Sequence, residues 1–160
     1  MLSTDVNCKK ISYLCRLNKT VENERINYIF YIMNKILEKL RYAKTHEWIE
    51  LLNDTTARIG ISDFAQQALG DIVFINLPEI GDAVTADQAF GDIESVKTVS
   101  DIVSPVTGTV STVNQEVIDQ PEVINENPYE NWFVEISDIS AESGLMTAVE
   151  YEEFCKEEAH

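Results

Sequence analysis

Basic residues are nearly absent from most of this sequence. Between Arg58 and Lys156, a stretch of 97 residues contains a single basic side chain, Lys97. The average density of 12 Lys and Arg in 160 residues would place about seven there. With 28 acidic residues, the chain has a net charge of -16, which repels nucleic acid phosphates and anionic lipid. We therefore expect neither nucleic acid nor a membrane as partner, but basic surfaces of other proteins.

Cysteine and histidine are also scarce. The three cysteines are scattered and form no C-x-x-C pair: Cys8, Cys15 and Cys155. This odd set argues against a disulfide framework and a zinc site and fits a reducing compartment, the cytoplasm or, in a eukaryote, the mitochondrial matrix. The two histidines, His46 and His160, leave little material for metal binding or acid-base catalysis. We predict no metal site and no catalytic residues.

Long apolar runs are missing too, and the charge divides the chain. The run IFYIM near the N-terminus is too short to span a membrane, and no signal-type cleavage site follows it. Residues 1–40 hold 7 basic and 4 acidic side chains, whereas residues 41–160 hold 5 basic and 24 acidic ones. We predict an N-terminal extension, 1–40, and one folded domain, 41–160.

The extension allows several interpretations. Apolar residues recur at helical spacing from Ile26 to Leu40, which predicts an amphipathic helix over 24–41. A mitochondrial presequence is an alternative, although Glu22, Glu24 and Glu38 are unusual for one. A third interpretation is a flexible segment that is not native, with translation starting at Met33.

Short strands separated by turn residues dominate the rest of the chain. The expected strands are 47–52, 56–61, 71–77, 88–96, 98–104, 106–114 and 131–137. A short helix is expected after the N-cap Ser62, ending at Gly70, and a C-terminal helix after Thr147, whose capping-box partner is Glu150. This pattern predicts a mainly β barrel or sandwich with short helices.

Lys97 falls where strands 88–96 and 98–104 must reverse direction. Its neighbours Ser95, Val96, Thr98 and Val99 make a stiff, uncharged tip. An ordinary solvated lysine is one interpretation. The other is a single amine presented for modification, since acylation would remove its charge. A hydrolase would require the fold to bring His46 to Ser95 or Ser100, because no histidine lies near them in sequence.

Five blocks of the sequence together resemble one family. They are RYAKTHEW, GISDFAQQALGDIVFINLPEIGD, FGDIESVKTVSD, SPVTGTVSTVN and PEVINENPYENWFVEI, and they cover residues 41 to about 157. Their content and order resemble the H protein of the glycine cleavage system, a lipoyl carrier. The resemblance implies a hybrid barrel-sandwich fold of the lipoyl and biotinyl carrier type, with lipoate joined by an amide to Lys97.

The resemblance also implies a role in glycine catabolism as a carrier, not an enzyme. The carrier takes an aminomethyl group from glycine decarboxylase (P protein) to the aminomethyltransferase (T protein), and electrons to dihydrolipoamide dehydrogenase (L protein). A lipoate-attaching enzyme is a further partner, and the carrier is expected to be a monomer. Glu94, Ser95 and Val96 correspond to a recognition loop. Glu47 and Asp101 correspond to acids near the arm, or are ordinary surface carboxylates.

Two departures and several alternatives remain. PYENW is shorter than the family's usual P-Y-G-x-G-W and lacks its glycine, so the turn before Trp132 must differ. Ala68 lies where some relatives have a histidine near the arm. A biotin carrier would have methionines beside the lysine, and a 2-oxoacid dehydrogenase domain would have D-K-A. An H-like lipoyl relay or docking protein outside glycine cleavage remains an alternative.

Overall fold

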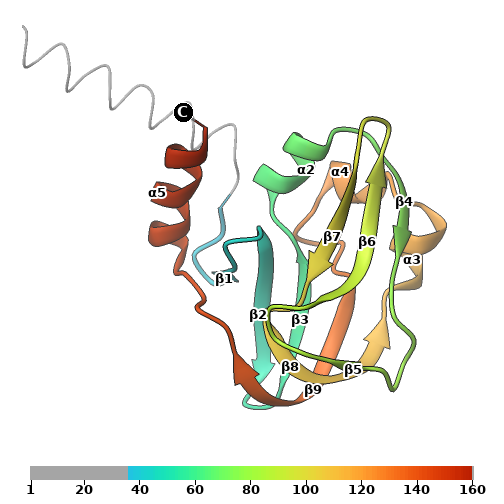
Figure 1. The fold of residues 1–160 in the computed structure, drawn as a ribbon, viewed down its shortest axis with the longest axis vertical. Helices are drawn as coiled ribbons and strands as arrows, with labels where there is room; N and C mark the ends of the chain where they lie inside the picture. Colours follow the sequence, from blue (N-terminus) through green and yellow to red (C-terminus); the bar gives the residue numbers. More distant parts are fainter. Residues whose placement is uncertain (1–35, 160) are drawn as a thin grey trace, which may run out of the picture. The chain divides into compact units, whose positions relative to one another are not determined.

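The described residues, 36–159 of a computed structural model, form two antiparallel β-sheets (Figure 1). The larger sheet has the strand order β1 (Arg41–Tyr42), β2 (Glu47–Asn53), β3 (Thr56–Ile61), β9 (Val134–Glu142), β8 (Val106–Val113), β5 (Ala83–Val84). The smaller has the order β4 (Ile72–Asn76), β6 (Ala89–Ser95), β7 (Val99–Val103). The helices are α2 (Asp63–Leu69), α3 (Gln115–Asp119), α4 (Val123–Glu126) and α5 (Ala148–Glu158). The predicted mainly β barrel-sandwich with a C-terminal helix is confirmed.

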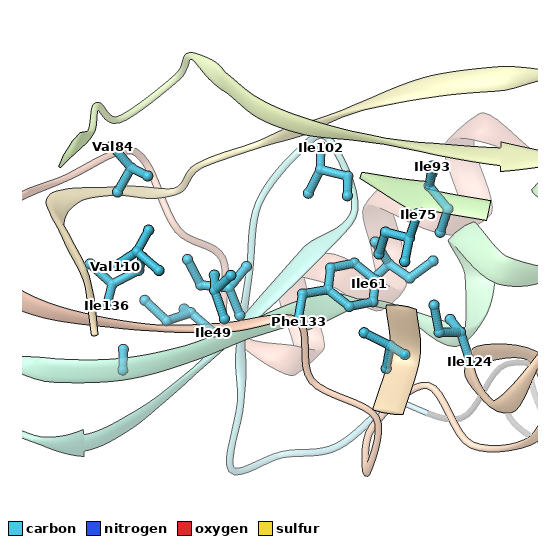
Figure 2. Packing of buried hydrophobic residues seen from close by; sticks show 14 of the residues in the cluster. Ile49, Ile61, Ile75, Val84, Ile93, Ile102, Val110, Ile124, Phe133 and Ile136 are labelled. Atoms are coloured by element: carbon cyan, nitrogen blue, oxygen red, sulfur yellow. The ribbon is translucent and has the colours of Figure 1, made fainter. Parts of the chain in front are cut away.

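The core lies between the inner faces of the two sheets (Figure 2). Each strand of the small sheet contributes a buried isoleucine, Ile75 from β4, Ile93 from β6 and Ile102 from β7, and β3 contributes Ile59. Phe133, which precedes β9, is fully buried among them and donates its backbone N–H to Ile59 O at 2.7 Å. Each such side chain contributes roughly 1.5–3 kcal/mol by leaving water, so this core holds the two sheets together.

The start of the folded part differs from the prediction. The helix expected over 24–41 is wrong for residues 36–41, because they form a turn and then β1, which pairs with β2. Leu40 is buried, and the Tyr42 hydroxyl accepts from Leu37 N at 2.7 Å and donates to Leu37 O at 3.1 Å. The apolar spacing of Leu37 and Leu40 therefore serves tertiary packing. Residues 1–35 lie outside the described residues, so the extension stays a prediction.

Two short helices, α3 and α4, were not predicted. Each is too short to show a helical apolar period, and each contributes one fully buried side chain to the core, Val117 from α3 and Ile124 from α4. Asn114 is a local signal that could have revealed α3, because its side chain accepts from Glu116 N as an N-cap. Tertiary packing stabilises helices of this length.

The loop after α4 explains the missing glycine of PYENW. The Asn131 amide donates to Val123 O at 2.8 Å and to Asn127 O at 2.9 Å, and Asn131 N also donates to Asn127 O. No residue from 128 to 132 has a positive φ. The turn therefore needs no glycine. Pro128 O accepts from Trp48 Nε1 at 3.2 Å, which fixes the loop on β2.

The C-terminal helix α5 begins as predicted at Thr147, whose side chain and that of Glu150 form a capping box. Tyr151 stacks on Tyr42 with ring centroids 4.3 Å apart, and its hydroxyl lies 2.6 Å from the Ser62 hydroxyl and 2.8 Å from His46 Nδ1. The helix is thus fixed to the body through β1 and the N-cap of α2. Within residues 36–159, no helix has the length and apolar character needed to cross a membrane.

Candidate functional site

The tip of the β6–β7 hairpin carries Lys97 and lies beside α2 (Figure 1). Ser95, the last residue of β6, is 5% exposed, and its N–H donates to Thr98 O at 2.8 Å. The Ser95 hydroxyl accepts from Lys97 N at 3.3 Å and Thr98 N at 3.2 Å. One inward hydroxyl therefore closes the turn and leaves the Lys97 side chain exposed.

The predicted recognition loop has two exposed members and one buried member. Glu94 and Val96 are exposed, whereas the Ser95 side chain is turned inward to the backbone of the tip. A partner could contact Glu94 and Val96 directly. Ser95 would affect binding only through the turn conformation that its hydroxyl stabilises. The role of this loop in recognition stays a prediction.

The tip is also tied to the end of α2. Val96 N donates to Asp71 O at 3.0 Å. Gly70, which ends α2 with a φ of 79°, lies under the lysine: a Cβ built there would be 3.3 Å from Lys97 Cε and 3.7 Å from its Nζ. The lysine stem thus rests on a position without a side chain, at the carbonyl end of a helix, where a cation is favoured.

Lys97 differs from several other basic residues in its pairing. Three of them form ion pairs, Lys39 with Glu50, Arg58 with Glu135 and Lys156 with Glu152. Within residues 36–159, no ion pair involves Lys97. An unpaired amine on an exposed tip is available to a modifying enzyme.

Exposed apolar side chains surround the tip on the outer face of the small sheet. Cross-strand pairing aligns Phe74 of β4, Glu94 of β6 and Val99 of β7 in one row. Phe74 and Val99 are both at least half exposed, as is Val96 at the tip. We call Phe74, Val96 and Val99 the tip face. Apolar groups gathered at one exposed place are typical of an interaction surface.

A cavity of about 140 Å³ lies between α2, the start of β2 and β7. Its lining residues are Thr45, His46, Glu47, Ile61, Ala65, Ala68, Leu69, Ile93, Ser100 and Asp101. The cavity thus brings together the two acids singled out from the sequence, Glu47 and Asp101. Ala68 leaves the α2 wall apolar where a histidine would have been polar. Thr45 was missed, because no sequence period marks it, and Ser100 was considered only as a possible hydrolase serine.

The two acids have different environments. Glu47 is 1% exposed, accepts from the Thr45 hydroxyl, and its Oε1 accepts from Val103 N at 2.8 Å. Burial raises the pKa of Glu47 to about 7, although these two hydrogen bonds favour the ionised form. Asp101 is exposed. The interpretation as a surface carboxylate is therefore wrong for Glu47 and agrees with the exposure of Asp101.

His46 lines the same cavity, but both of its ring nitrogens contact residues of α5. Nδ1 is hydrogen-bonded to the Tyr151 hydroxyl, and Nε2 lies 2.8 Å from Glu158 Oε2. Burial lowers the pKa of His46, and Glu158 opposes this effect. The Ser95 hydroxyl faces the tip turn, and the Ser100 hydroxyl donates to Asp101 O at 3.4 Å, so neither is bonded to the imidazole. The arrangement required by a hydrolase is not formed.

Other possible sites offer less. A second cavity, about 210 Å³, is bordered by Lys44, Asp87 and Ser104 among others and includes no residue of the tip. Within the described part of the chain, no three His, Cys, Asp or Glu side chains are grouped to hold a metal ion. The hairpin tip and the smaller cavity beside α2 are therefore the candidate site.

Comparisons with known proteins agree on one family. The sequence profile described as "Glycine cleavage H-protein" matches residues 40–158. The chain is 52% identical over 124 residues to the glycine cleavage system H protein of Lachnoclostridium phytofermentans, covering 78% of this chain and 98% of the relative. It is 52% identical over 129 residues to that of Halalkalibacterium halodurans, covering 79% and 100%.

A solved structure gives the same result. The crystal structure of a glycine cleavage system H protein from Mycobacterium marinum superposes with a TM-score of 0.71 at 35% identity, covering 78% of this chain and all of that chain. This match agrees with the resemblance noted in the five sequence blocks. The chain belongs to the glycine cleavage H-protein family, whose members are carriers and not catalysts.

Proposed function

We propose that this protein is the lipoyl-bearing carrier of a glycine cleavage system, with lipoate attached to Lys97. The observation that carries the proposal is the placement of Lys97 on a turn closed by Ser95. Its exposed amine is the single basic group in the 97 residues between Arg58 and Lys156. The residues fit the group, because the amine can be acylated without breaking an ion pair within residues 36–159.

The attached group supplies the chemistry that the side chains lack. Lipoate provides two sulfurs that accept and release an aminomethyl group and electrons. The carrier would take the aminomethyl group from the glycine decarboxylase to the aminomethyltransferase and electrons to dihydrolipoamide dehydrogenase. We propose that it acts as a monomer in the cytoplasm and receives lipoate from a lipoate-attaching enzyme.

The cavity beside α2 is proposed to receive the loaded end of the arm. Ala65, Ala68 and Leu69 give it an apolar wall, and Glu47 and Asp101 offer carboxylates to an amine. A cation near Glu47 would favour the ionised carboxylate and offset its burial. These two acids would therefore hold the amine by charge-assisted hydrogen bonds.

Docking is proposed to use the tip face and the acidic charge around it. Asp92 and Asp101 are paired across β6 and β7, two residues along the strands from the pair Glu94 and Val99. A partner with a basic rim and an apolar centre fits this combination.

Mass spectrometry of protein from its native cell tests the attachment. We expect the intact mass to show one lipoyl group, and peptide spectra to place it on Lys97. An unmodified Lys97 in cells whose lipoate-attaching enzymes are active would contradict the proposal. Lipoylation of Lys97 without support of glycine cleavage in a reconstituted system would instead favour the relay function.

A further inference from the structure

We propose that Asn125 of α4 is a positioning residue for Lys97, acting through the connection between α2 and β4. The inference rests on the proposed function and concerns how the lysine is presented to the enzyme that modifies it. We call Gly70 and Asp71 the lysine platform, because the Lys97 stem lies over Gly70 and Asp71 O accepts from Val96 N.

The Asn125 side chain binds both sides of the lysine platform. Its Nδ2 donates to Gly70 O and to Gln66 Oε1, each at 2.9 Å, and its Oδ1 accepts from Ile72 N at 2.9 Å. An amide is the side chain that can donate twice and accept at the same place. These contacts connect the last turn of α2 to the first residue of β4 and so restrain the two residues between them.

The restraint reaches the lysine in two steps. The platform holds the tip at Asp71 O, which accepts from Val96 N, one residue before Lys97. The lysine stem also lies over Gly70, because a Cβ added there would come within 3.3 Å of Lys97 Cε. Asn125 is itself held in place by Ile124, which is fully buried. The lysine platform is therefore anchored to the core through α4.

Such a restraint matters for an acyl transfer to one amine. The enzyme must bring the Lys97 nitrogen to an activated acyl group, and a lysine on a mobile tip would spend less time in the productive geometry. The hydrogen bonds of Ser95 order the tip itself, and those of Asn125 order the lysine platform beside it. Asn125 does not touch the amine, so its role is positioning.

Asn125→Ala tests this role, with Asn131→Ala as the matched control. Both asparagines donate two side-chain hydrogen bonds, but those of Asn125 go to Gln66 and Gly70, whereas those of Asn131 go to Val123 O and Asn127 O and serve the loop before Trp132. The measurements are kcat/KM of a lipoate-attaching enzyme for the apo-protein and the hydrogen-exchange rate of the Val96 amide. Both are made well below the melting temperatures of the variants.

We expect Asn125→Ala to lower kcat/KM about tenfold and to raise the Val96 exchange rate about fivefold, with Asn131→Ala within about twofold of wild type. Wild-type kinetics for Asn125→Ala, unchanged Val96 exchange, or equal losses in both variants would overturn the inference. If wild-type Lys97 is not modified at all, the proposed function fails, while Val96 exchange still tests the platform.

A glycine pair tests the platform if Asn125→Ala does not fold. Gly70 and Gly81 both have positive φ, 79° and 97°, so alanine strains the backbone at either position. A Cβ at Gly70 would contact the Lys97 stem, whereas a Cβ at Gly81 would have no neighbour within 4 Å. We expect Gly70→Ala, but not Gly81→Ala, to slow attachment about fivefold. Equal rates in the two variants would overturn the inference.

Discussion

The outer faces of the two sheets differ in the side chains they carry and in whether those side chains form ion pairs. On the large sheet, one cross-strand row joins Glu50, Arg58 and Glu135, and Arg58 Nε lies 2.8 Å from Glu135 Oε1. On the small sheet, the corresponding row is Phe74, Glu94 and Val99.

In the charged row, Arg58 pairs with Glu135, and Glu50 pairs with Lys39, which precedes β1. The mixed row instead leaves Phe74 and Val99 exposed with the Glu94 carboxylate between them. Both sheets bury apolar residues on their inner faces, so the difference does not reflect the needs of the core. We therefore propose the outer face of the small sheet, with Phe74 and Val99 exposed on it, as the surface for contacts with other molecules.

Lys97→Arg tests the functional side of this comparison and has the largest expected effect. Arginine keeps the charge, but its guanidinium cannot form the amide of a lipoyl group. We expect complete loss of glycine cleavage in a reconstituted system, with the melting temperature unchanged because the side chain is exposed. Retained activity in that assay would show that Lys97 is not the attachment point.

Phe133→Ala tests the stability side. Removing a fully buried ring between the sheets should lower the free energy of unfolding by about 3–5 kcal/mol. Urea denaturation measures this change. The fraction that remains folded should be lipoylated at the wild-type rate, because Phe133 is not part of the tip. A loss below about 1 kcal/mol would mean that the two sheets do not depend on this contact.

Local chemistry explains which parts of the fold could be predicted. The Ser62 cap, the Gly70 stop and the Thr147–Glu150 capping box are interactions between residues close in sequence, and all three are present. The helix predicted through residues 36–41 failed because Leu40 is held by tertiary contacts. The helical spacing that predicted it was a by-product of that packing.

The candidate site was predictable only in part, for the same reason. Lys97 stood out by composition and by the resemblance, which is information carried within the sequence. The cavity joins β2, α2 and β7, which are remote in sequence, so its volume and the burial of Glu47 could not be anticipated. Asn125 has no local signal at all, because its partners Gln66, Gly70 and Ile72 are more than 50 residues away.

Glu47→Gln should change the pH dependence of stability. The folded-state pKa of about 7 lies above the ordinary 4.5, so the stability contribution of Glu47 is present below 4.5 and lost as pH rises through 7. That difference corresponds to about 3 kcal/mol as an upper value. Glutamine does not ionise, so the free energy of unfolding of the variant, relative to wild type, should increase between pH 5 and pH 8.

Urea denaturation at both pH values measures the gain, and Asp101→Asn is the matched control. Asp101 lines the same cavity but is exposed, so Asp101→Asn controls for the loss of one carboxylate from this place. Parallel profiles for Glu47→Gln and wild type would mean that folding does not raise the pKa of Glu47, so that its carboxylate is ionised in the folded protein across this pH range. The cavity would then already contain a formal charge before any amine reaches it.

Val99→Thr has the smallest expected effect on function and addresses the tip face directly. Val99 is 61% exposed, and threonine keeps its shape and its β-branch while replacing a methyl group by a hydroxyl. Val149 on α5 is 70% exposed and provides the matched Val149→Thr control. Both variants should stay within about 0.5 kcal/mol of wild type in stability.

Only Val99→Thr should weaken docking, by about threefold in the KM of the lipoate-attaching enzyme or of the decarboxylase for this carrier. The reason is that burial of a hydroxyl in an apolar contact gains less than burial of a methyl group. Higher salt should raise the KM of wild type and variant by the same factor, because ions screen the acidic surface but not an apolar contact. An effect of Val149→Thr equal to that of Val99→Thr would remove the distinction between the tip face and the rest of the exposed apolar surface.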